Sequence, residues 1–165
     1  MFLNRQSLKA RGISPKTWMI TSTGESLSMK DNVFLDTAFV IASAIESDAY
    51  HEKALELLKE IRALGIQMVT THAIVLEIGN ALARLRYRSL AIAALDSMET
   101  DDKVKIIPLT KDLLETGYKL FRSRTDKEWG LVDCVSFVAM KQLGITEALT
   151  TDQHFQQAGF AALLR

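Results

Sequence analysis

Val33-Phe34-Leu35-Asp36-Thr37 is a short apolar run that ends in a carboxylic acid and a hydroxyl. Consecutive apolar residues without alternation are typical of a strand that is buried on both faces of a parallel sheet. A helix-compatible stretch, residues 38–45, follows directly. The pattern predicts a strand that carries Asp36 at its carboxyl end and leads at once into a helix.

The same alternation of strand and helix continues outward from this segment. Further strands are predicted at 66–70, 104–107 and 148–150, and residues 160–164 are a candidate edge strand. Helical periodicity predicts helices at 51–64, 73–88, 90–99, 110–122 and 131–143. Parallel strands joined by helices carry those helices on both faces of the sheet. The predicted fold class is α/β, a three-layer α/β/α sandwich with a central parallel sheet.

Composition limits the class of protein. The chain has 165 residues, of which 48% are apolar, and its 20 basic and 20 acidic residues cancel. This length predicts one domain, and the balance excludes a polycation or an acidic tail. The single cysteine, Cys134, allows no intramolecular disulfide and favours a reducing compartment. Neither a membrane span nor a secretory signal is evident, so we expect a cytoplasmic protein.

Residues 1–30 differ from the rest of the chain. They become rich in Ser, Thr and Gly toward their end, contain Pro15 and show no sustained period. They also hold five basic residues and one acidic residue, which leaves residues 31–165 with an acidic excess. We predict that residues 1–30 form a poorly ordered N-terminal extension and that the folded domain spans residues 31–165.

Four acids occupy unusual positions in the predicted fold. Two of them lie where a parallel sheet binds ligands, and two lie where burying an unpaired charge costs free energy. Asp36 and Asp152 follow predicted strands, and ligands bind at the carboxyl edge of an open parallel sheet. Glu77 and Asp133 lie within apolar helical segments, where an unpaired carboxylate costs several kcal/mol or becomes protonated. Each acid alone has an ordinary alternative, such as Asp36-Thr37 capping the helix that follows.

Oxygen ligands of this kind suit Mg²⁺ or Mn²⁺. Such a site can activate a water on one side of a phosphodiester and stabilise the leaving oxygen on the other, without a His or Cys nucleophile. The set of four acids therefore favours metal-dependent phosphoryl chemistry.

The chain resembles the PIN domain family and, within it, the VapC-type toxins of type II toxin–antitoxin systems. The resemblance covers about residues 32–160, and residues 1–30 match no part of the pattern. Four segments carry it in order: Val33-Phe34-Leu35-Asp36-Thr37, Glu77-Ile78-Gly79-Asn80-Ala81-Leu82-Ala83-Arg84, Leu131-Val132-Asp133-Cys134-Val135-Ser136-Phe137 and Leu149-Thr150-Thr151-Asp152-Gln153-His154-Phe155.

The resemblance implies a Mg²⁺- or Mn²⁺-dependent endoribonuclease with a toxin role. It implies a homodimer and an antitoxin partner that blocks the site. Asp36, Glu77 and Asp133 would be the principal metal ligands, and Asp152 would be the fourth acid. The hydroxyl groups that orient ligands or water, and the amide that supports them, would be those of Thr37, Ser136, Thr150 and Asn80.

An acidic nuclease needs basic groups that hold RNA. Two clusters are candidates, one after the Glu77 segment and one before the Asp133 segment. Trp129 lies beside the second cluster, where a core position is favoured over stacking on a base, and His154 is expected at the surface. The candidate RNA-binding residues are Arg84, Arg86, Arg88, Arg122, Arg124 and Lys127.

Two other classes with an Asp after the first strand do not fit. A HAD-type phosphatase needs a second Asp two residues later, where this chain has Ala38. A receiver domain needs an acidic pair beside the first strand and a late Lys, and neither is evident. A housekeeping PIN-domain RNA-processing nuclease remains an alternative, as does a non-catalytic PIN-fold binding module, although the presence of all four acids argues against the latter.

Overall fold

The computed structural model describes residues 31–165. The prediction of an N-terminal extension at residues 1–30 falls outside the described residues. The elements, in chain order, are β1 (Asn32–Leu35), α2 (Thr37–Ala44), α3 (His51–Leu64), β2 (Gln67–Thr71), α4 (His72–Ala81), the 3₁₀ turn η2 (Leu85–Tyr87), α5 (Arg88–Thr100), β3 (Val104–Ile107), α6 (Lys111–Ser123), α7 (Leu131–Leu143), β4 (Glu147–Leu149), α8 (Gln153–Gln157) and β5 (Ala161–Ala162).

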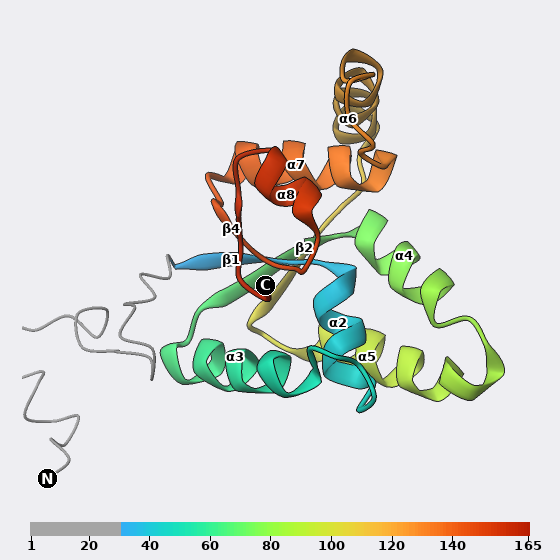
Figure 1. Cartoon of the computed structure of the whole chain (residues 1–165), viewed down its shortest axis with the longest axis vertical. Coiled ribbons are helices and arrows are strands. Elements are labelled where there is room, and N and C mark those ends of the chain that lie inside the picture. The colour runs from blue at the N-terminus through green and yellow to red at the C-terminus, as the bar shows by residue number, and fades with distance from the viewer. Residues whose placement is uncertain (1–30) are drawn as a thin grey trace, which may run out of the picture.

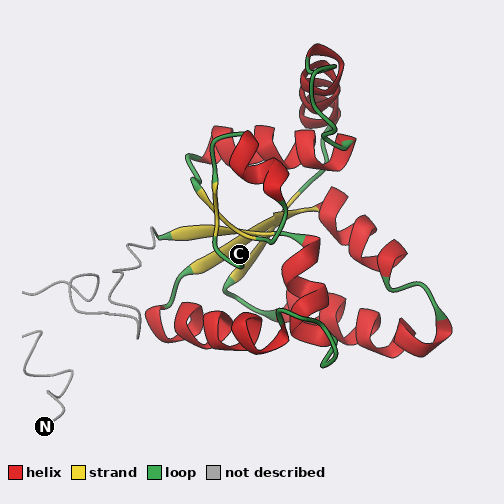
Figure 2. Cartoon of the chain, viewed as in Figure 1, coloured by secondary structure: helices red, strands yellow, loops and turns green. Residues whose placement is uncertain are grey.

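A five-stranded sheet divides the domain into layers. Its strands lie in the order β3-β2-β1-β4-β5, and all four pairings are parallel. Helices α2, α3 and α5 lie on one side of the sheet, and α6, α7 and α8 lie on the other (Figures 1 and 2). The predicted three-layer α/β/α sandwich is confirmed, and the candidate edge strand is present as the short β5.

The central strand β1 is buried throughout its apolar run. Val33 and Phe34 have no exposed surface, and Leu35 is 3% exposed. Phe155 of α8 contacts both the ring of Phe34 and that of Phe137 on α7, at centroid distances of 6.0 and 5.0 Å. This aromatic cluster fixes α7 and α8 against the carboxyl half of the sheet.

The predicted helix at 73–88 is shorter than its periodicity suggested. Helix α4 ends at Ala81, and the backbone at Arg84 is extended. The guanidinium of Arg88 donates to the carbonyl oxygen of Ala83 at 3.0 Å, which satisfies an acceptor beyond the end of the helix. Neither Gly nor Pro marks this end, and Leu85, which lies within the predicted helix, is 93% exposed.

Helices α6 and α7 pack closely at a glycine. A methyl group added at Gly117 would lie 2.6 Å from Cγ2 of Val135 and 3.1 Å from its Cα. Such a contact requires a backbone shift, because Val135 is buried and branched at Cβ.

Replacing Gly117 with Ala is expected to lower the free energy of unfolding by about 1–3 kcal/mol, although Ala is the better helix former. Gly79 of α4 has no atom within 4 Å of an added methyl, so Gly79→Ala is expected to raise stability by up to about 1 kcal/mol. Urea unfolding of both variants measures the difference. A stability of Gly117→Ala equal to that of Gly79→Ala contradicts the close packing.

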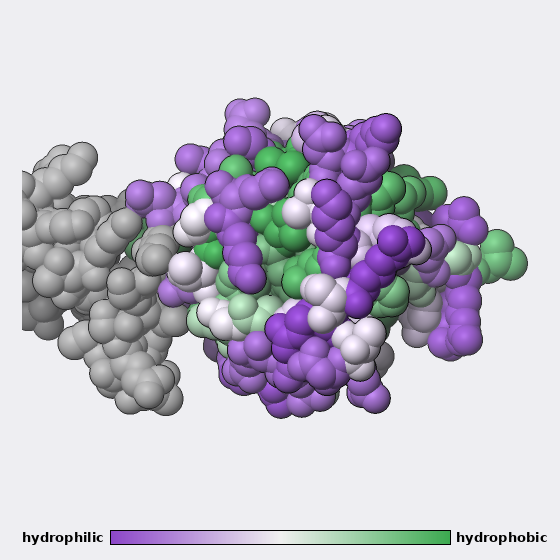
Figure 3. Space-filling view, turned by 90° about the horizontal axis from the view of Figure 1, so that it is seen from above, coloured by the Kyte–Doolittle hydropathy of each residue, from purple (hydrophilic) through white to green (hydrophobic). Residues whose placement is uncertain are grey.

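The outer surface of the helical layer that contains α6, α7 and α8 is partly apolar. Figure 3, which views the molecule from above Figure 1, shows hydrophobic residues surrounded by hydrophilic ones on this face. Leu114, Tyr118 and Phe121 of α6 are each 40–43% exposed, and their spacing places them along one side of the helix. Among residues 31–165, no helix has the length and apolar character needed to cross a membrane.

Candidate active site

The first predicted site residue, Asp36, lies at the point where the strand order of the sheet reverses. Leu35 of β1 pairs with Leu149 of β4, so the residues that follow them, Asp36 and Thr150, leave the sheet side by side. The hydroxyl of Thr150 donates to Oδ2 of Asp36 at 2.6 Å. Both residues are buried, with exposed fractions of 6% and 0%. In open α/β sheets, ligands bind at the point where the strand order reverses.

The alternative role of Asp36, as a helix cap, is wrong. Asp36 occupies the N-cap position of α2, but its side chain makes no capping hydrogen bond. Its backbone carbonyl accepts from the first turn, from the N–H groups of Phe39 and Val40. The carboxylate instead faces Thr150, so its position serves the sheet edge rather than the helix.

Glu77 is brought to the same edge by α4. Thr37, the first residue of α2, donates its hydroxyl hydrogen to Oε2 of Glu77 at 2.5 Å. Because Thr37 directly follows Asp36, this bond places the Glu77 carboxylate beside the Asp36 carboxylate. The predicted residues Asp36, Thr37, Glu77 and Thr150 are therefore grouped in the structure.

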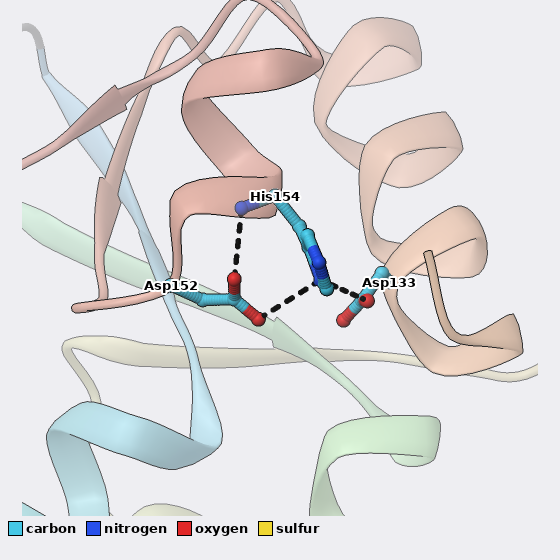
Figure 4. A group of neighbouring side chains, drawn as sticks. All are labelled: Asp133, Asp152 and His154. Atoms are coloured by element: carbon cyan, nitrogen blue, oxygen red, sulfur yellow. Dashed lines mark hydrogen bonds and ion pairs between the residues drawn. The ribbon is translucent and has the colours of Figure 1, made fainter. Parts of the chain in front are cut away.

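Asp133, Asp152 and His154 form the other half of the group (Figure 4). Asp152 is the N-cap of α8, where its Oδ1 accepts from the N–H of His154 at 2.8 Å. The imidazole Nδ1 of His154 lies 3.3 Å from Oδ2 of Asp133 and 3.4 Å from Oδ2 of Asp152. Asp133 lies in the first turn of α7, and its Oδ2 also accepts from the N–H of Gly130 at 2.8 Å.

Hydrogen bonds connect the two halves of the site. The Oγ1 of Thr150, which donates to Asp36, also accepts from the N–H of Asp152 at 2.9 Å. A continuous line of contacts therefore runs from Asp36 through Thr150, Asp152 and His154 to Asp133. Four segments that are far apart in the sequence contribute one carboxylate each.

The electrostatics of this group are unfavourable without a cation. The pKa of Asp36 is raised from 3.8 to about 7, mainly by burial and also by the neighbouring charges of Glu77 and Asp133, against the opposing hydrogen bond from Thr150. Burial also raises the pKa of Asp133, and Asp152 adds to this effect. Within residues 31–165, no Lys or Arg forms an ion pair with any of the four acids.

The residues present fit a divalent metal ion. Carboxylate oxygens are the ligands of Mg²⁺ and Mn²⁺ in proteins. Asp133, Asp152 and His154 each offer one ligand atom, and these atoms lie within 4.8 Å of one another. The charges of Glu77 and Asp133 also oppose the ionisation of Asp36, and a doubly charged ion would offset that repulsion.

The two remaining residues that were predicted to support the site are Asn80 and Ser136. Asn80 lies one turn after Glu77, and both line a cavity of about 380 Å³ whose other walls are apolar side chains of α4, α6, α7 and the loop before α6. Ser136 is fully buried, and in the described part of the chain its Oγ has no hydrogen-bond partner. Neither residue contacts a carboxylate of the site by a hydrogen bond that the structure records.

The basic residues and Trp129 have distinct environments. Arg84, Arg86 and Arg88 are exposed around η2, beyond the end of α4. In the second cluster, the guanidinium of Arg124 pairs with Asp126 at 2.8 Å and lies over the Trp129 ring at 4.7 Å. Trp129 is 6% exposed and packs edge-on against Phe137 at 5.1 Å, which confirms its core position.

Sequence reasoning missed the role of His154. It predicted a surface position, but the His154 side chain is 20% exposed and lies between two carboxylates. One feature of the sequence could have indicated this position. His154 lies two residues after Asp152 and directly before Phe155, which is fully buried. The prediction overlooked the short helix α8, whose first turn directs His154 toward Asp133.

Comparisons with known proteins agree with this geometry. The PIN domain family model matches residues 33–161. The chain is 30% identical over 128 residues to a protein from Mycobacterium tuberculosis named 23S rRNA-specific endonuclease VapC20, covering 78% of this chain and 95% of that protein. The crystal structure of that VapC20, described as a Sarcin-Ricin loop cleaving toxin, superposes with a TM-score of 0.71 at 27% identity, covering 78% of this chain and 96% of VapC20.

A more distant solved structure shares the fold alone. FitAcB from Neisseria gonorrhoeae superposes with a TM-score of 0.58 at 18% identity, covering 79% of this chain and 94% of that chain. The family match extends from the first residues of β1 to β5 and includes all four acids. The chain belongs to the PIN domain family, and it is similar over most of its length to a VapC-type toxin.

Proposed function

We propose that this protein is a Mg²⁺- or Mn²⁺-dependent endoribonuclease and the toxin of a type II toxin–antitoxin pair. The observation that carries the proposal is the grouping of four carboxylates at one sheet edge, with no Lys or Arg among residues 31–165 paired to them. The line of contacts from Asp36 to Asp133 joins three of them, and the hydrogen bond from Thr37 places Glu77 beside Asp36. The similarity to an endonuclease toxin over 78% of the chain supports the same reading.

The residues of the chain have separate tasks in this proposal. Asp36, Glu77, Asp133 and Asp152 hold the cation, while Thr150 and Thr37 fix the Asp36 and Glu77 carboxylates by hydrogen bonds. A bound Mg²⁺ or Mn²⁺ would activate water and offset the charge on the leaving oxygen. Asn80 and Ser136 stay proposed as supporting residues, since each lies three positions after an acid on the same helix.

The RNA would be held by the exposed basic residues. Arg84, Arg86 and Arg88 are the stronger candidates, because their cluster contains no acid that neutralises it. In the second cluster, Arg122 and Lys127 remain candidates, whereas Arg124 is engaged by Asp126. Ribosomal RNA is the first substrate to test, because the relative from Mycobacterium tuberculosis is named for 23S rRNA.

Two protein partners belong to this proposal. An antitoxin would block the carboxylate group, and a second copy of the chain would form a homodimer in the cytoplasm. The exposed apolar side chains of α6, Leu114, Tyr118 and Phe121, support the presence of a protein contact on that face.

The direct test is cleavage of purified ribosomal RNA, with the new ends mapped by sequencing. The wild type is expected to cut at defined positions with Mn²⁺ and to stop in EDTA, and Asp133→Asn is expected to reduce the rate by about 10²-fold or more. Asp112→Asn, which makes the same change at an exposed position in the first turn of α6, is the matched control. Cleavage by Asp133→Asn at the wild-type rate overturns the proposal.

The housekeeping alternative is separated by the response of cells. A toxin arrests growth when it is induced, and co-expression of the neighbouring gene restores growth. A processing nuclease instead tolerates induction while it still cleaves RNA in vitro.

A further inference from the structure

We propose that His154 is a nitrogen ligand that makes the Asp133–Asp152 half of the site selective for a transition-metal cation such as Mn²⁺ over Mg²⁺. The inference rests on the metal-dependent function proposed above and adds a residue that the four-carboxylate account does not use. It concerns the ion that the site holds, and binding and spectroscopy test it directly.

The positions of the ligand atoms carry the inference. Neighbouring ligand atoms about 2.1–2.3 Å from an octahedral cation lie about 3.0–3.3 Å from each other. The Nδ1 of His154 lies 3.3 Å from Oδ2 of Asp133 and 3.4 Å from Oδ2 of Asp152. All three ligand atoms lie within 4.8 Å of one another, so one cation can contact them together with small adjustments (Figure 4).

His154 is held in this place by the fold. Its backbone N–H donates to Oδ1 of Asp152 at 2.8 Å, which leaves Oδ2 of Asp152 to face the imidazole. The next residue, Phe155, has no exposed surface, and its ring packs against Phe34 and Phe137. The fold therefore places the imidazole between the two carboxylates.

The charge and accessibility of the group suit a divalent ion. The two aspartates supply two negative charges, and a neutral imidazole adds a donor atom without adding charge. The side chains of His154, Asp133 and Asp152 are 20%, 19% and 35% exposed, so an ion can reach them from solvent.

Selectivity follows from the donor atom. Mg²⁺ is bound in proteins by oxygen ligands and dehydrates reluctantly, whereas imidazole nitrogen binds transition-metal cations. The Asp36–Glu77 half of the site offers oxygen alone, so the two halves are expected to prefer different ions.

Pulsed electron paramagnetic resonance of the Mn²⁺-saturated full chain is the test. The chain contains three histidines, and the wild type is expected to show ¹⁴N coupling from a directly bound imidazole. The coupling should vanish in His154→Gln and persist in His72→Gln, whose side chain is exposed at the start of α4. Absence of coupling in the wild type, or its survival in His154→Gln, overturns the inference.

Affinity measurements give an independent result. His154→Gln is expected to weaken Mn²⁺ binding by at least about tenfold while changing Mg²⁺ binding by less than about threefold. An equal loss for both ions overturns the inference, because it indicates that His154 only positions the carboxylates.

A further variant tests the inference even if His154→Gln fails to fold. The double variant His51→Asn/His72→Gln retains His154 as its single imidazole and must keep the ¹⁴N coupling. Failure of the two proposals is distinguishable: RNA cleavage without ¹⁴N coupling overturns this inference alone, and ¹⁴N coupling without any RNA cleavage overturns the proposed function alone.

Discussion

An Asp36→Asn variant is expected to fold normally and to lose RNA cleavage by about 10²–10³-fold. The amide oxygen of Asn can still accept the hydrogen bond from Thr150, so the local geometry is retained. The lost charge is the one that a divalent ion needs, because Asp36 lies beside both Glu77 and Asp133. Single-turnover cleavage with saturating Mn²⁺ measures the loss.

The matched control for this variant is Asp96→Asn on α5. Asp96 is exposed and makes no side-chain hydrogen bond among the contacts of residues 31–165, so the same chemical change there should leave the rate within about twofold. Full activity of Asp36→Asn, or a comparable loss in Asp96→Asn, contradicts the assigned role of Asp36.

The second large effect is on the stability of the metal-free protein. The pKa of Asp36 is raised from 3.8 to about 7, mainly by burial, so the folded state binds a proton more tightly than the unfolded state. The stabilisation that this tighter proton binding at Asp36 gives the folded state is therefore complete below about pH 4 and is lost as the pH rises toward 7. The shift corresponds to at most about 4 kcal/mol.

Urea unfolding in EDTA between pH 5 and 8 tests this effect. We expect the wild type to lose stability as pH rises, Asp36→Asn to lose much less, and Asp36→Asn to be the more stable protein at pH 8. Adding Mn²⁺ at pH 8 is expected to stabilise the wild type, because the ion replaces the proton. Parallel pH profiles for the two proteins would show that Asp36 carries no such penalty.

The sequence predicted the parts of this molecule that depend on local pattern. Strand β1 and its terminal Asp36 follow from an uninterrupted apolar run. The predicted helices at 51–64 and 131–143 end where α3 and α7 end, and each is followed by a glycine, Gly65 and Gly144, with φ of 68° and 67°. Because parallel strands end at one edge, the convergence of Asp36 and Asp152 could also be anticipated.

The parts that the sequence did not predict depend on contacts across the fold. The end of α4 at Ala81 lacks a Gly or Pro signal, and the following chain turns while Leu82 remains buried. The place of His154 depends on the packing of Phe155 against two distant rings and on the first turn of a five-residue helix. Periodicity over such a short element carries little information.

A crystal grown with Mn²⁺, with the ion located from its anomalous scattering, tests the central claim most directly. We predict Mn²⁺ among the carboxylate oxygens of Asp36, Glu77, Asp133 and Asp152, with those side chains close to their present positions. Anomalous density confined to other parts of the molecule, in crystals of protein that still cleaves RNA with Mn²⁺, would contradict the account.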